Sequence, residues 1–237
     1  MRTFRSPLLL GHRGARVPNI SENTFAAFDY CLVAGCHGFE FDVRLTGDGR
    51  AMVCHDEKIR GLRVDQETCA ELQERCKSKA SIGGAGLCLL ENVLEHYGQG
   101  AFLDIELKVS GLTSLLIEAL QQFPPQHGYV VSSFLPTVLL DIHQQDDEIP
   151  LGLIADCKPD LELWSELPVD YVIPHYRLAS IALIRNVHGA GKKVLVWTVN
   201  RPADMLRLRD WDVDGMIADD PELFSSTMGP KRGRSKG

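Results

Sequence analysis

Two carboxylates in an otherwise apolar segment are the first side chains that could do chemistry. Residues 38–43 read Gly-Phe-Glu-Phe-Asp-Val. In a β-strand, Glu40 and Asp42 share one face, and the phenylalanines share the other, where helices would cover them. Both carboxylates then point toward an interior, where two like charges about 7 Å apart repel unless a cation lies between them. A buried Arg or Lys partner is the alternative to a metal ion.

A second segment repeats this pattern. Residues 102–108 read Phe-Leu-Asp-Ile-Glu-Leu-Lys, which places Asp104, Glu106 and Lys108 on one face of a strand. Lys108 could pair with a carboxylate or contact a ligand anion. Glu40, Asp42 and Glu106 would form a ligand set of hard oxygen atoms without a cysteine. Such a set suits Mg²⁺ or Ca²⁺ better than zinc. If the two strands are neighbours, such a set can converge.

Two histidines follow other apolar segments. His12 and Arg13 follow Leu-Leu-Leu-Gly, and His55 follows Ala-Met-Val-Cys. Arg13 could clamp an anion beside a proton-carrying His12, although a salt-bridged rim explains the pair as well, and His55 alone would be a surface histidine. Together, one imidazole can accept a proton while the other donates one, and the cations can hold developing negative charge. Phosphodiester cleavage needs these parts.

Alternating strands and helices must position these side chains. Eight short runs rich in Val, Ile, Leu and Phe occur, with helix-like segments such as 22–33, 112–123, 137–145 and 181–187 between most of them; the runs lie near 8–12, 38–45, 101–107, 129–134, 151–155, 171–174, 194–199 and 215–218. This alternation predicts parallel βαβ units. Over this length it predicts a (β/α)₈ TIM barrel, in which function collects at the carboxyl ends of the strands. A doubly wound sheet is the alternative.

One further run, residues 50–55, does not fit the alternation. It follows Thr-Gly-Asp-Gly at 46–49, which is a hairpin signal between two strand-like segments. We therefore expect the second strand to continue above the barrel, turn and come back. Such a hairpin would return His55 to about the level of Phe39 and Glu40.

The rest of the chain fits one domain. Residues 57–90 are more polar than their neighbours and include a glycine-rich loop at 83–86, which indicates a small insertion rather than a second domain. We predict a single barrel domain over residues 1–228 with this insertion after the hairpin. Residues 229–237 are predicted to form a basic, frayed tail, and contact of this tail with nucleic acid or anionic lipid is the alternative.

The charge balance argues against nucleic acid as a partner. The formal net charge is −7, and residues 231–237 carry four basic and no acidic side chains. The first 230 residues therefore have 21 basic and 32 acidic side chains, a net charge of −11. An acidic body of this kind argues against a general affinity for nucleic acid.

The cysteines and the hydropathy pattern indicate a compartment. Seven cysteines occur, an odd number with no Cys-x-x-Cys pair, which suits a reducing compartment. No apolar run reaches 18 residues, so no membrane span is expected. We therefore expect a cytoplasmic protein, whose oligomeric state the sequence does not indicate.

Taken in chain order, these residues resemble the glycerophosphodiester phosphodiesterase family. The family pattern is His-Arg, Glu-x-Asp, His-Asp and a Glu-x-Lys strand. It matches His12-Arg13, Glu40-Phe41-Asp42, His55-Asp56 and Glu106-Leu107-Lys108. Lesser matches lie at Ser21-Glu22-Asn23-Thr24, Ser132-Ser133-Phe134, 196–200 and 213–221.

The resemblance implies a TIM barrel enzyme that hydrolyses a glycerophosphodiester to sn-glycerol 3-phosphate and an alcohol. It implies His12 and His55 as the acid/base pair, with Arg13 and Lys108 on the phosphoryl oxygens. Trp197 would line the pocket or pack in the core. The resemblance also implies one Mg²⁺ or Ca²⁺ ion on three carboxylates: Glu40, Asp42 and Glu106. A cyclic phosphate intermediate, formed by attack of the substrate's own hydroxyl, is compatible with these residues.

The sequence departs from the family in two places. Ser21 replaces a proline before Glu22-Asn23-Thr24, where Asn23 or Thr24 can cap a helix. After His55-Asp56 the chain reads Glu-Lys-Ile-Arg-Gly-Leu-Arg, which differs from the family and affects substrate identity more than catalysis. Three alternative functions follow: a related phospholipase-D-like or phosphoinositide-specific barrel, activity on lysophospholipids, or a non-catalytic protein that binds a phosphodiester.

Overall fold

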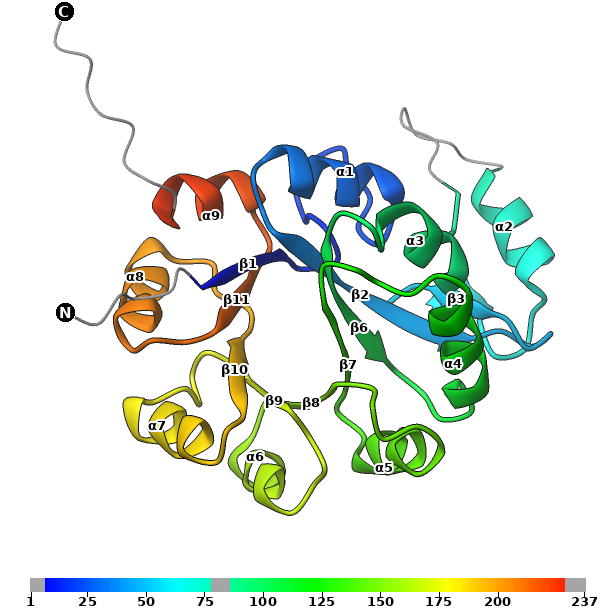
Figure 1. Cartoon of the computed structure of the whole chain (residues 1–237). Coiled ribbons are helices and arrows are strands. Elements are labelled where there is room, and N and C mark those ends of the chain that lie inside the picture. Colours follow the sequence, from blue (N-terminus) through cyan, green and yellow to red (C-terminus); the bar gives the residue numbers. More distant parts are fainter. Residues whose placement is uncertain (1–6, 78–85, 229–237) are drawn as a thin grey trace, which may run out of the picture.

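A closed parallel barrel forms the body of the protein. The computed structural model describes residues 7–77 and 86–228. Neighbouring strands pair in chain order, and β1 pairs with both β2 and β11, so the sheet closes on itself (Figure 1). The described residues thus contain eight parallel strands: β1 (Leu8–Gly11), β2 (Gly38–Leu45), β6 (Phe102–Leu107), β7 (Tyr129–Ser133), β8 (Leu151–Ala155), β9 (Tyr171–Pro174), β10 (Lys193–Val196) and β11 (Gly215–Ala218). This is the predicted TIM barrel and not the doubly wound sheet.

Helices cover the outer face of the strands (Figure 1). The helix predicted at 22–33 begins at Phe25, because the Thr24 hydroxyl caps it by accepting a hydrogen bond from the Ala27 backbone N–H at 3.3 Å. Within the described ranges, no helix is long and apolar enough to cross a membrane. The surrounding helices are α1 (Phe25–Val33), α3 (Leu90–Tyr97), α4 (Thr113–Gln122), α5 (Pro136–Gln145), α6 (Lys158–Glu162) with a 3₁₀ turn (Leu163–Ser165), α7 (Ile181–Gly189), α8 (Pro202–Asp210) and α9 (Pro221–Met228).

The interior of the barrel is apolar except along β2 and β6. Large apolar side chains fill most of it: Leu10, Phe102, Val130, Ile154, Tyr171, Ile173, Leu195 and Ile217. The two neighbouring strands β2 and β6 instead carry buried carboxylates: Glu40, Asp42, Asp104 and Glu106. In the β2–β6 ladder Glu40 lies opposite Asp104, and Asp42 lies opposite Glu106. The predicted neighbour relation of these strands is thus correct.

Aromatic rings hold β2 against its helices. Phe39 and Phe41, which alternate with the carboxylates, point outward and are fully buried. The ring of Phe28 on α1 stacks on Phe39 with centroids 4.1 Å apart. The ring of Tyr97 on α3 meets Phe39 edge-on at 5.1 Å. This packing on the outer face fixes which face of β2 turns inward. The phenylalanines on one face of the strand thus determine that the carboxylates on the other face point into the barrel.

A hairpin continues β2 above the barrel. The returning strand β3 (Ala51–Val53) pairs antiparallel with the end of β2. The backbone N–H of Thr46 donates to the carbonyl of Arg50 at 3.0 Å, so only residues 47–49 reverse the chain. The turn is therefore one residue shorter than the four predicted from Thr-Gly-Asp-Gly.

The shorter turn changes the level of His55. In the ladder Val43 lies opposite Val53, and the backbone N–H of Cys54 donates to the carbonyl of Asp42 at 3.0 Å. Continued by two residues, this register brings His55 to the level of Phe41. The hairpin therefore returns His55 to within one residue of the predicted level, about that of Phe39 and Glu40.

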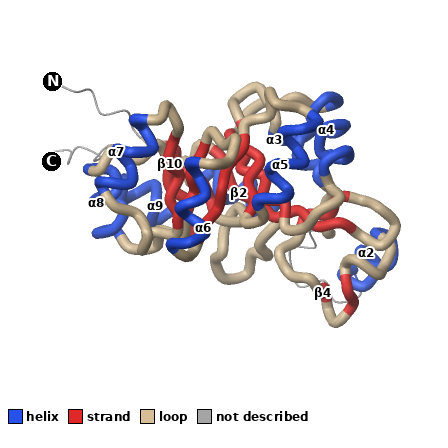
Figure 2. Tube along the Cα trace, turned by 90° about the horizontal axis from the view of Figure 1, so that it is seen from below, coloured by secondary structure: helices blue, strands red, loops and turns tan. Residues whose placement is uncertain are grey.

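The insertion after the hairpin is a small extension of the barrel. It contains the paired strands β4 (Lys58–Ile59) and β5 (Leu62–Arg63) and helix α2 (Cys69–Lys77). Figure 2 shows α2 and β4 at one corner of the molecule, away from α7, α8 and α9. The predicted loop at 83–86 lies outside the described residues apart from Gly86, and so does the predicted tail at 229–237.

Phe28 provides a test of the packing that orients β2. We expect Phe28→Ala to lower the free energy of unfolding by about 3–5 kcal/mol, because it leaves a cavity against Phe39 and Tyr97. Urea unfolding followed by circular dichroism measures this loss. Val33→Ala is the matched control on the same helix, since the Val33 side chain is 88% exposed and its loss should change stability by no more than about 0.5 kcal/mol. Equal effects of both substitutions would contradict the role given to Phe28.

Candidate active site

A pocket of about 120 Å³ opens among the strand ends. Its two walls differ in character. The strands β1, β2 and β6 and the hairpin supply the polar wall, formed by His12, Arg13, Glu40, His55, Asp104, Glu106 and Lys108. The later strands and their loops supply the apolar wall, formed by Phe134, Ile154, Ile173, Trp197 and Ile217. The pocket thus combines ionisable groups on one side with a surface for uncharged parts of a ligand on the other.

Three carboxylates converge on the polar wall. One oxygen from each of Glu40, Asp42 and Glu106 lies within 4.8 Å of the other two, and all three residues are buried. Burial, with Asp42 and Glu106 nearby, raises the pKa of Glu40 well above its usual value. Burial and the neighbouring Asp42 raise the pKa of Glu106 to about 7. Their ionisation is therefore costly unless positive charge is placed beside them.

Asp42 behaves differently because two cations and an amide face it. Its oxygens lie 3.3 Å from Arg13 Nε and 3.4 Å from Lys108 Nζ. The side-chain amide of Asn23 donates to Asp42 Oδ2 at 2.8 Å, and the Asp42 N–H donates to Asn23 Oδ1 at 3.2 Å. Burial opposes ionisation of Asp42, but Lys108 and Arg13 outweigh it and hold its pKa below the usual range. Asn23 therefore fixes a carboxylate instead of capping α1.

Asp104 also lines the pocket, together with the carboxylates of Glu40 and Glu106. Ser132 on β7 donates its hydroxyl proton to Asp104 Oδ1 at 2.6 Å, while Asp104 Oδ2 has no hydrogen-bond partner among the described residues. Burial raises the pKa of Asp104 to about 7. Alternation on β6 predicted the face of this residue but no role for it.

The donor set fits a hard divalent cation. Four buried carboxyl groups face two cationic side chains, Arg13 and Lys108, so both the ion pairs and the excess negative charge that the sequence allowed are present. Glu40 Oε1 has no hydrogen-bond partner within the described part of the chain. Buried oxygens of this kind are the ligands that Mg²⁺ and Ca²⁺ take. The carboxylate trio of Glu40, Asp42 and Glu106 is therefore a candidate metal site.

His12 lies at the start of a tight turn after β1. A Cβ on Gly11 would come within 1.9 Å of the Gly14 carbonyl oxygen, so this turn needs glycine at position 11. His12 Nδ1 lies 2.6 Å from Asp219 Oδ1, and its Nε2 lies 3.9 Å from Glu40 Oε2. The imidazole thus bridges the end of β11 and the carboxylate trio.

His55 reaches the same pocket from the hairpin. Its Nδ1 lies 2.8 Å from Asp56 Oδ1, and its carbonyl accepts a hydrogen bond from Arg44 Nε at 2.6 Å. The His55 side chain is 34% exposed, whereas that of His12 is 11% exposed. Two imidazoles therefore line one pocket, where they differ in exposure to solvent.

The two predicted anion-binding residues are held by carboxylates. The Arg13 guanidinium donates to Glu22 Oε1 at 2.7 Å, and Glu22 Oε2 also contacts Arg16 Nε at 2.7 Å. Lys108 Nζ lies 2.6 Å from Glu106 Oε1. Both side chains still line the pocket, so ion pairing fixes their position at its wall without removing them from it.

Trp197 both lines the pocket and packs against its neighbours. Its indole N–H donates to the carbonyl of Ile173 at 3.0 Å, and its ring meets those of Phe134 and His175 edge-on, each at 5.4 Å. The two roles that the sequence left open are therefore compatible, because the ring packs against Phe134 and His175 while the residue remains part of the apolar wall.

Sequence reasoning did not assign several residues that the structure places at the site. Glu22 and Asp219 occurred only as parts of motif matches, and Asn23 was considered only as a helix cap. Their partners lie 9, 207 and 19 residues away in the sequence, respectively. Their position beside Arg13, Asp42 and His12 depends on loops whose course the sequence pattern does not define.

Known proteins share both this sequence and this architecture. A glycerophosphodiester phosphodiesterase from Caldanaerobacter subterraneus subsp. tengcongensis is 32% identical, over 92% of this chain and 96% of that protein. The solved structure of a glycerophosphodiester phosphodiesterase from Thermotoga maritima has a TM-score of 0.77 at 25% identity, and the match covers 94% of this chain and 98% of that one.

A further structure agrees in fold. A phosphodiesterase from Oleispira antarctica, solved in complex with the product sn-glycerol-3-phosphate, has a TM-score of 0.81 at 23% identity, covering 94% of this chain and 97% of that one. Residues 12–223 match the model of the glycerophosphoryl diester phosphodiesterase family, a range that includes both histidines and all the carboxylates of the pocket. The chain therefore belongs to the glycerophosphoryl diester phosphodiesterase family of enzymes.

Proposed function

We propose that this chain hydrolyses glycerophosphodiesters to sn-glycerol 3-phosphate and an alcohol, and that the reaction depends on one Mg²⁺ or Ca²⁺ ion. The observation that carries the proposal is one pocket lined by two histidines and two cationic side chains, at whose wall three carboxylates converge. Membership of the family supports the reaction class. The names of the relatives and the product in the Oleispira antarctica structure support the substrate class.

The proposed mechanism assigns each part of the polar wall a task. Glu40, Asp42 and Glu106 would hold the cation, which supplies positive charge for the phosphoryl oxygens when bound. Arg13 and Lys108 line the same wall, where their charges stabilise the phosphoryl group as negative charge develops on it. Trp197 and its apolar neighbours contact the uncharged parts of the substrate.

His12 and His55 carry out the proton transfers in this proposal. One imidazole accepts the proton of a substrate glycerol hydroxyl as its oxygen attacks phosphorus. The other donates a proton to the oxygen of the departing alcohol as the bond from phosphorus to that oxygen breaks. Water then opens the resulting cyclic phosphate with the proton transfers reversed, which leaves sn-glycerol 3-phosphate and restores both histidines.

We also propose that residues 1–228 act as a single catalytic domain with its insertion at about 57–90, followed by a basic tail. The closed ring of strands supports this division. A cytoplasmic location is proposed as well. All seven cysteines have free thiols and five of them are buried, which suits a reducing compartment.

The first test is metal-dependent turnover. We expect the chain to release sn-glycerol 3-phosphate from sn-glycero-3-phosphocholine or sn-glycero-3-phosphoethanolamine after Mg²⁺ or Ca²⁺ is restored to the chelated protein, and not before. Glu40→Gln should abolish both the turnover and the binding of the cation measured by calorimetry, because it removes a buried charge of the trio.

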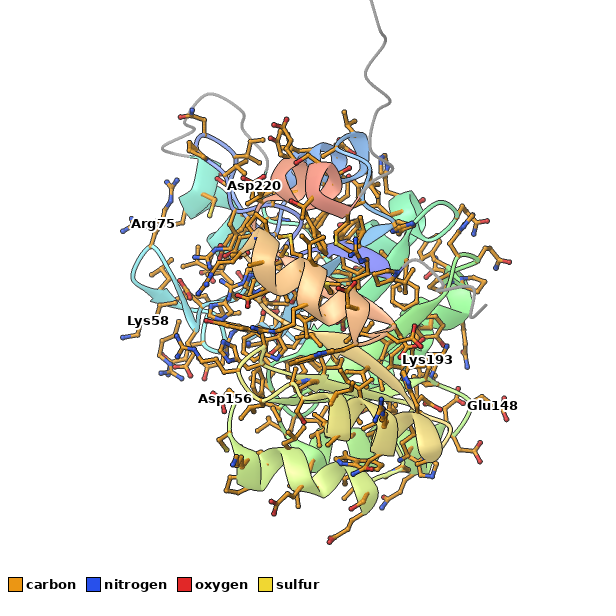
Figure 3. All side chains as sticks on the ribbon, turned by 90° about the vertical axis from the view of Figure 1, so that its left-hand side faces the viewer. Lys58, Arg75, Glu148, Asp156, Lys193 and Asp220 are labelled. Carbon is orange, nitrogen blue, oxygen red and sulfur yellow. The ribbon has the colours of Figure 1, made fainter. Side chains whose placement is uncertain are left out.

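Glu148→Gln is the matched control. Glu148 is exposed and lies toward the opposite end of the barrel from Lys58 and Asp156, as Figure 3 shows. Full activity of Glu40→Gln with unchanged metal dependence would overturn the metal site. Release of the alcohol from a lysophospholipid, but not from either glycerophosphodiester, would change the proposed substrate class to lysophospholipids. Binding of a glycerophosphodiester without hydrolysis would favour the non-catalytic alternative.

The two histidines are tested separately. We expect His12→Ala and His55→Ala each to lower kcat by about 10²–10⁴-fold, because each removes one proton transfer, while the fold and the cation affinity are kept. His127→Ala is the control, since His127 is exposed in the connection between α4 and β7. Steady-state kinetics with circular dichroism measures these effects, and a wild-type rate in either pocket variant would remove that residue from the mechanism.

The raised carboxyl pKa values predict how the cation and pH act together on stability. Glu106 and Asp104 have pKa values of about 7 in the folded protein, against 4.5 and 3.8 for ordinary Glu and Asp. Between these values the cation-free folded protein holds protons that the unfolded chain releases, so these groups lower stability as pH rises toward 7. A bound cation favours the ionised carboxylates and removes this loss.

Thermal unfolding should therefore show a larger gain in Tm from Mg²⁺ or Ca²⁺ at about pH 7.5 than at about pH 5. The measurement compares chelated and cation-saturated protein at both pH values. Glu40→Gln should show little gain at either. An equal gain at both pH values in the wild type would contradict the coupling between these buried carboxyl groups and the cation.

A further inference from the structure

The last strand of the barrel carries an aspartate beside each of its ends, and each aspartate contacts a histidine. Asp214 precedes β11, and its Oδ2 lies 2.8 Å from Nε2 of His188 on α7. Asp219 follows β11, and its Oδ1 lies 2.6 Å from Nδ1 of His12. The two pairs are chemically alike but lie at opposite ends of one strand, and only the second lies at the pocket.

The carboxylate of Asp219 is held from more than one side. The side-chain amide of Asn200 donates to Asp219 Oδ2 at 2.5 Å, and the backbone N–H of Asp219 donates to Asn200 Oδ1 at 2.9 Å. The backbone N–H of His12 donates to the carbonyl of Ala218 at 2.8 Å, which ties the two chain segments together beside the side-chain contact. The position of the carboxylate is therefore fixed relative to the imidazole.

The contacts also fix the charge of Asp219. Burial opposes ionisation, but hydrogen bonds from His12 and Asn200 and the nearby charge of Arg16 outweigh it, so the pKa of Asp219 lies below its usual value. An ionised carboxylate can only accept hydrogen bonds. In the neutral imidazole, Nδ1 must then carry the proton, and Nε2 is left with a lone pair.

The other histidine of the pocket, His55, contacts a much more exposed carboxylate. His55 also contacts an aspartate through Nδ1, but Asp56 is its sequence neighbour and its side chain is 78% exposed. The Asp219 side chain is 25% exposed. Solvent therefore competes for the His55–Asp56 contact much more than for the His12–Asp219 contact.

We propose that Asp219 is a positioning residue that holds His12 in the tautomer with the proton on Nδ1, so that Nε2 accepts the proton of the attacking hydroxyl, and that Asn200 holds Asp219 in turn. This inference rests on the proposed function, since it assigns His12 the first proton transfer. The proton transfer thus depends on residues from distant parts of the sequence. His12 follows the first barrel strand, and Asp219, which positions it, follows the last.

Asp219→Asn tests the proposal with little change in shape. The introduced amide can donate to Nδ1 and so favour the opposite tautomer, in which Nε2 carries the proton and cannot accept another. We expect kcat to fall by about 10²-fold or more with KM within about threefold of the wild type. Asn200→Ala should lower kcat less, by about 3–10-fold, because it removes only the second support.

Asp214→Asn is the matched control, because it alters a His–Asp pair on the same strand outside the pocket, and it should leave kcat unchanged. ¹⁵N NMR of histidine-labelled protein at about pH 8, where an ordinary imidazole is neutral, reports which ring nitrogen of His12 is protonated. We expect Nδ1–H in the wild type and Nε2–H in Asp219→Asn. A loss of stability alone would change neither this pattern nor kcat of the folded fraction.

The outcomes separate the two proposals. Unchanged kcat in Asp219→Asn, or an unchanged tautomer of His12, would overturn the positioning role even if the wild type is fully active. A wild type that releases no sn-glycerol 3-phosphate from any glycerophosphodiester would overturn the proposed function, whereas the NMR measurement would still decide whether Asp219 sets the tautomer. A fall in kcat with inversion of the tautomer supports the inference.

Discussion

The rest of the site depends on negative charge that is buried inside the barrel. Ionised carboxylates are costly in an apolar interior, and here four carboxyl groups occupy positions on β2 and β6 that the other strands fill with Leu, Ile and Val. The surrounding features compensate for this charge. Arg13 and Lys108 approach Asp42 from two sides, Asn23 donates to it, and Ser132 donates to Asp104. Since these groups do not neutralise the whole cluster, the carboxylate trio remains a candidate site for a further cation.

This charge can be held in place because the opposite face of β2 is packed so tightly. Phe39 and Phe41 alternate with Glu40 and Asp42, and their rings are buried against α1 and α3. If β2 were rotated about its own axis, the phenylalanine rings would lose their contacts with α1 and α3. The carboxylates would then be buried against the helices, away from Arg13 and Lys108. The energy that fixes the orientation of the reactive groups therefore comes from apolar contacts behind the strand, whereas the pocket itself contributes mostly unfavourable electrostatic terms that a ligand can relieve.

Much of this architecture follows from local sequence patterns. The alternation of residue types in β2 and β6 predicts the carboxylate faces, and the spacing of apolar runs predicts the eight-stranded barrel. The hairpin signal predicts that the chain returns toward the mouth, but the position of His55 depends on whether the turn has three or four residues. Asn23 and Thr24 are equally good caps by composition, and the backbone at Asn23, with φ of +57°, decides that Thr24 caps the helix and Asn23 contacts Asp42. The contact of His12 with Asp219 spans 207 residues, and no local pattern encodes it.

The seam between β1 and β11 has a consequence for the synthesis of the chain on the ribosome. His12 meets the carboxylate of Asp219 only when β11 pairs with β1. About nine-tenths of the sequence precedes β11. When the first seven barrel strands, up to β10, have been synthesised, the nascent chain already contains the carboxylate trio and both histidines. It still lacks Asp219. Because chain segments emerge in order, we expect the nascent protein to become competent for turnover only in the last stage of its translation.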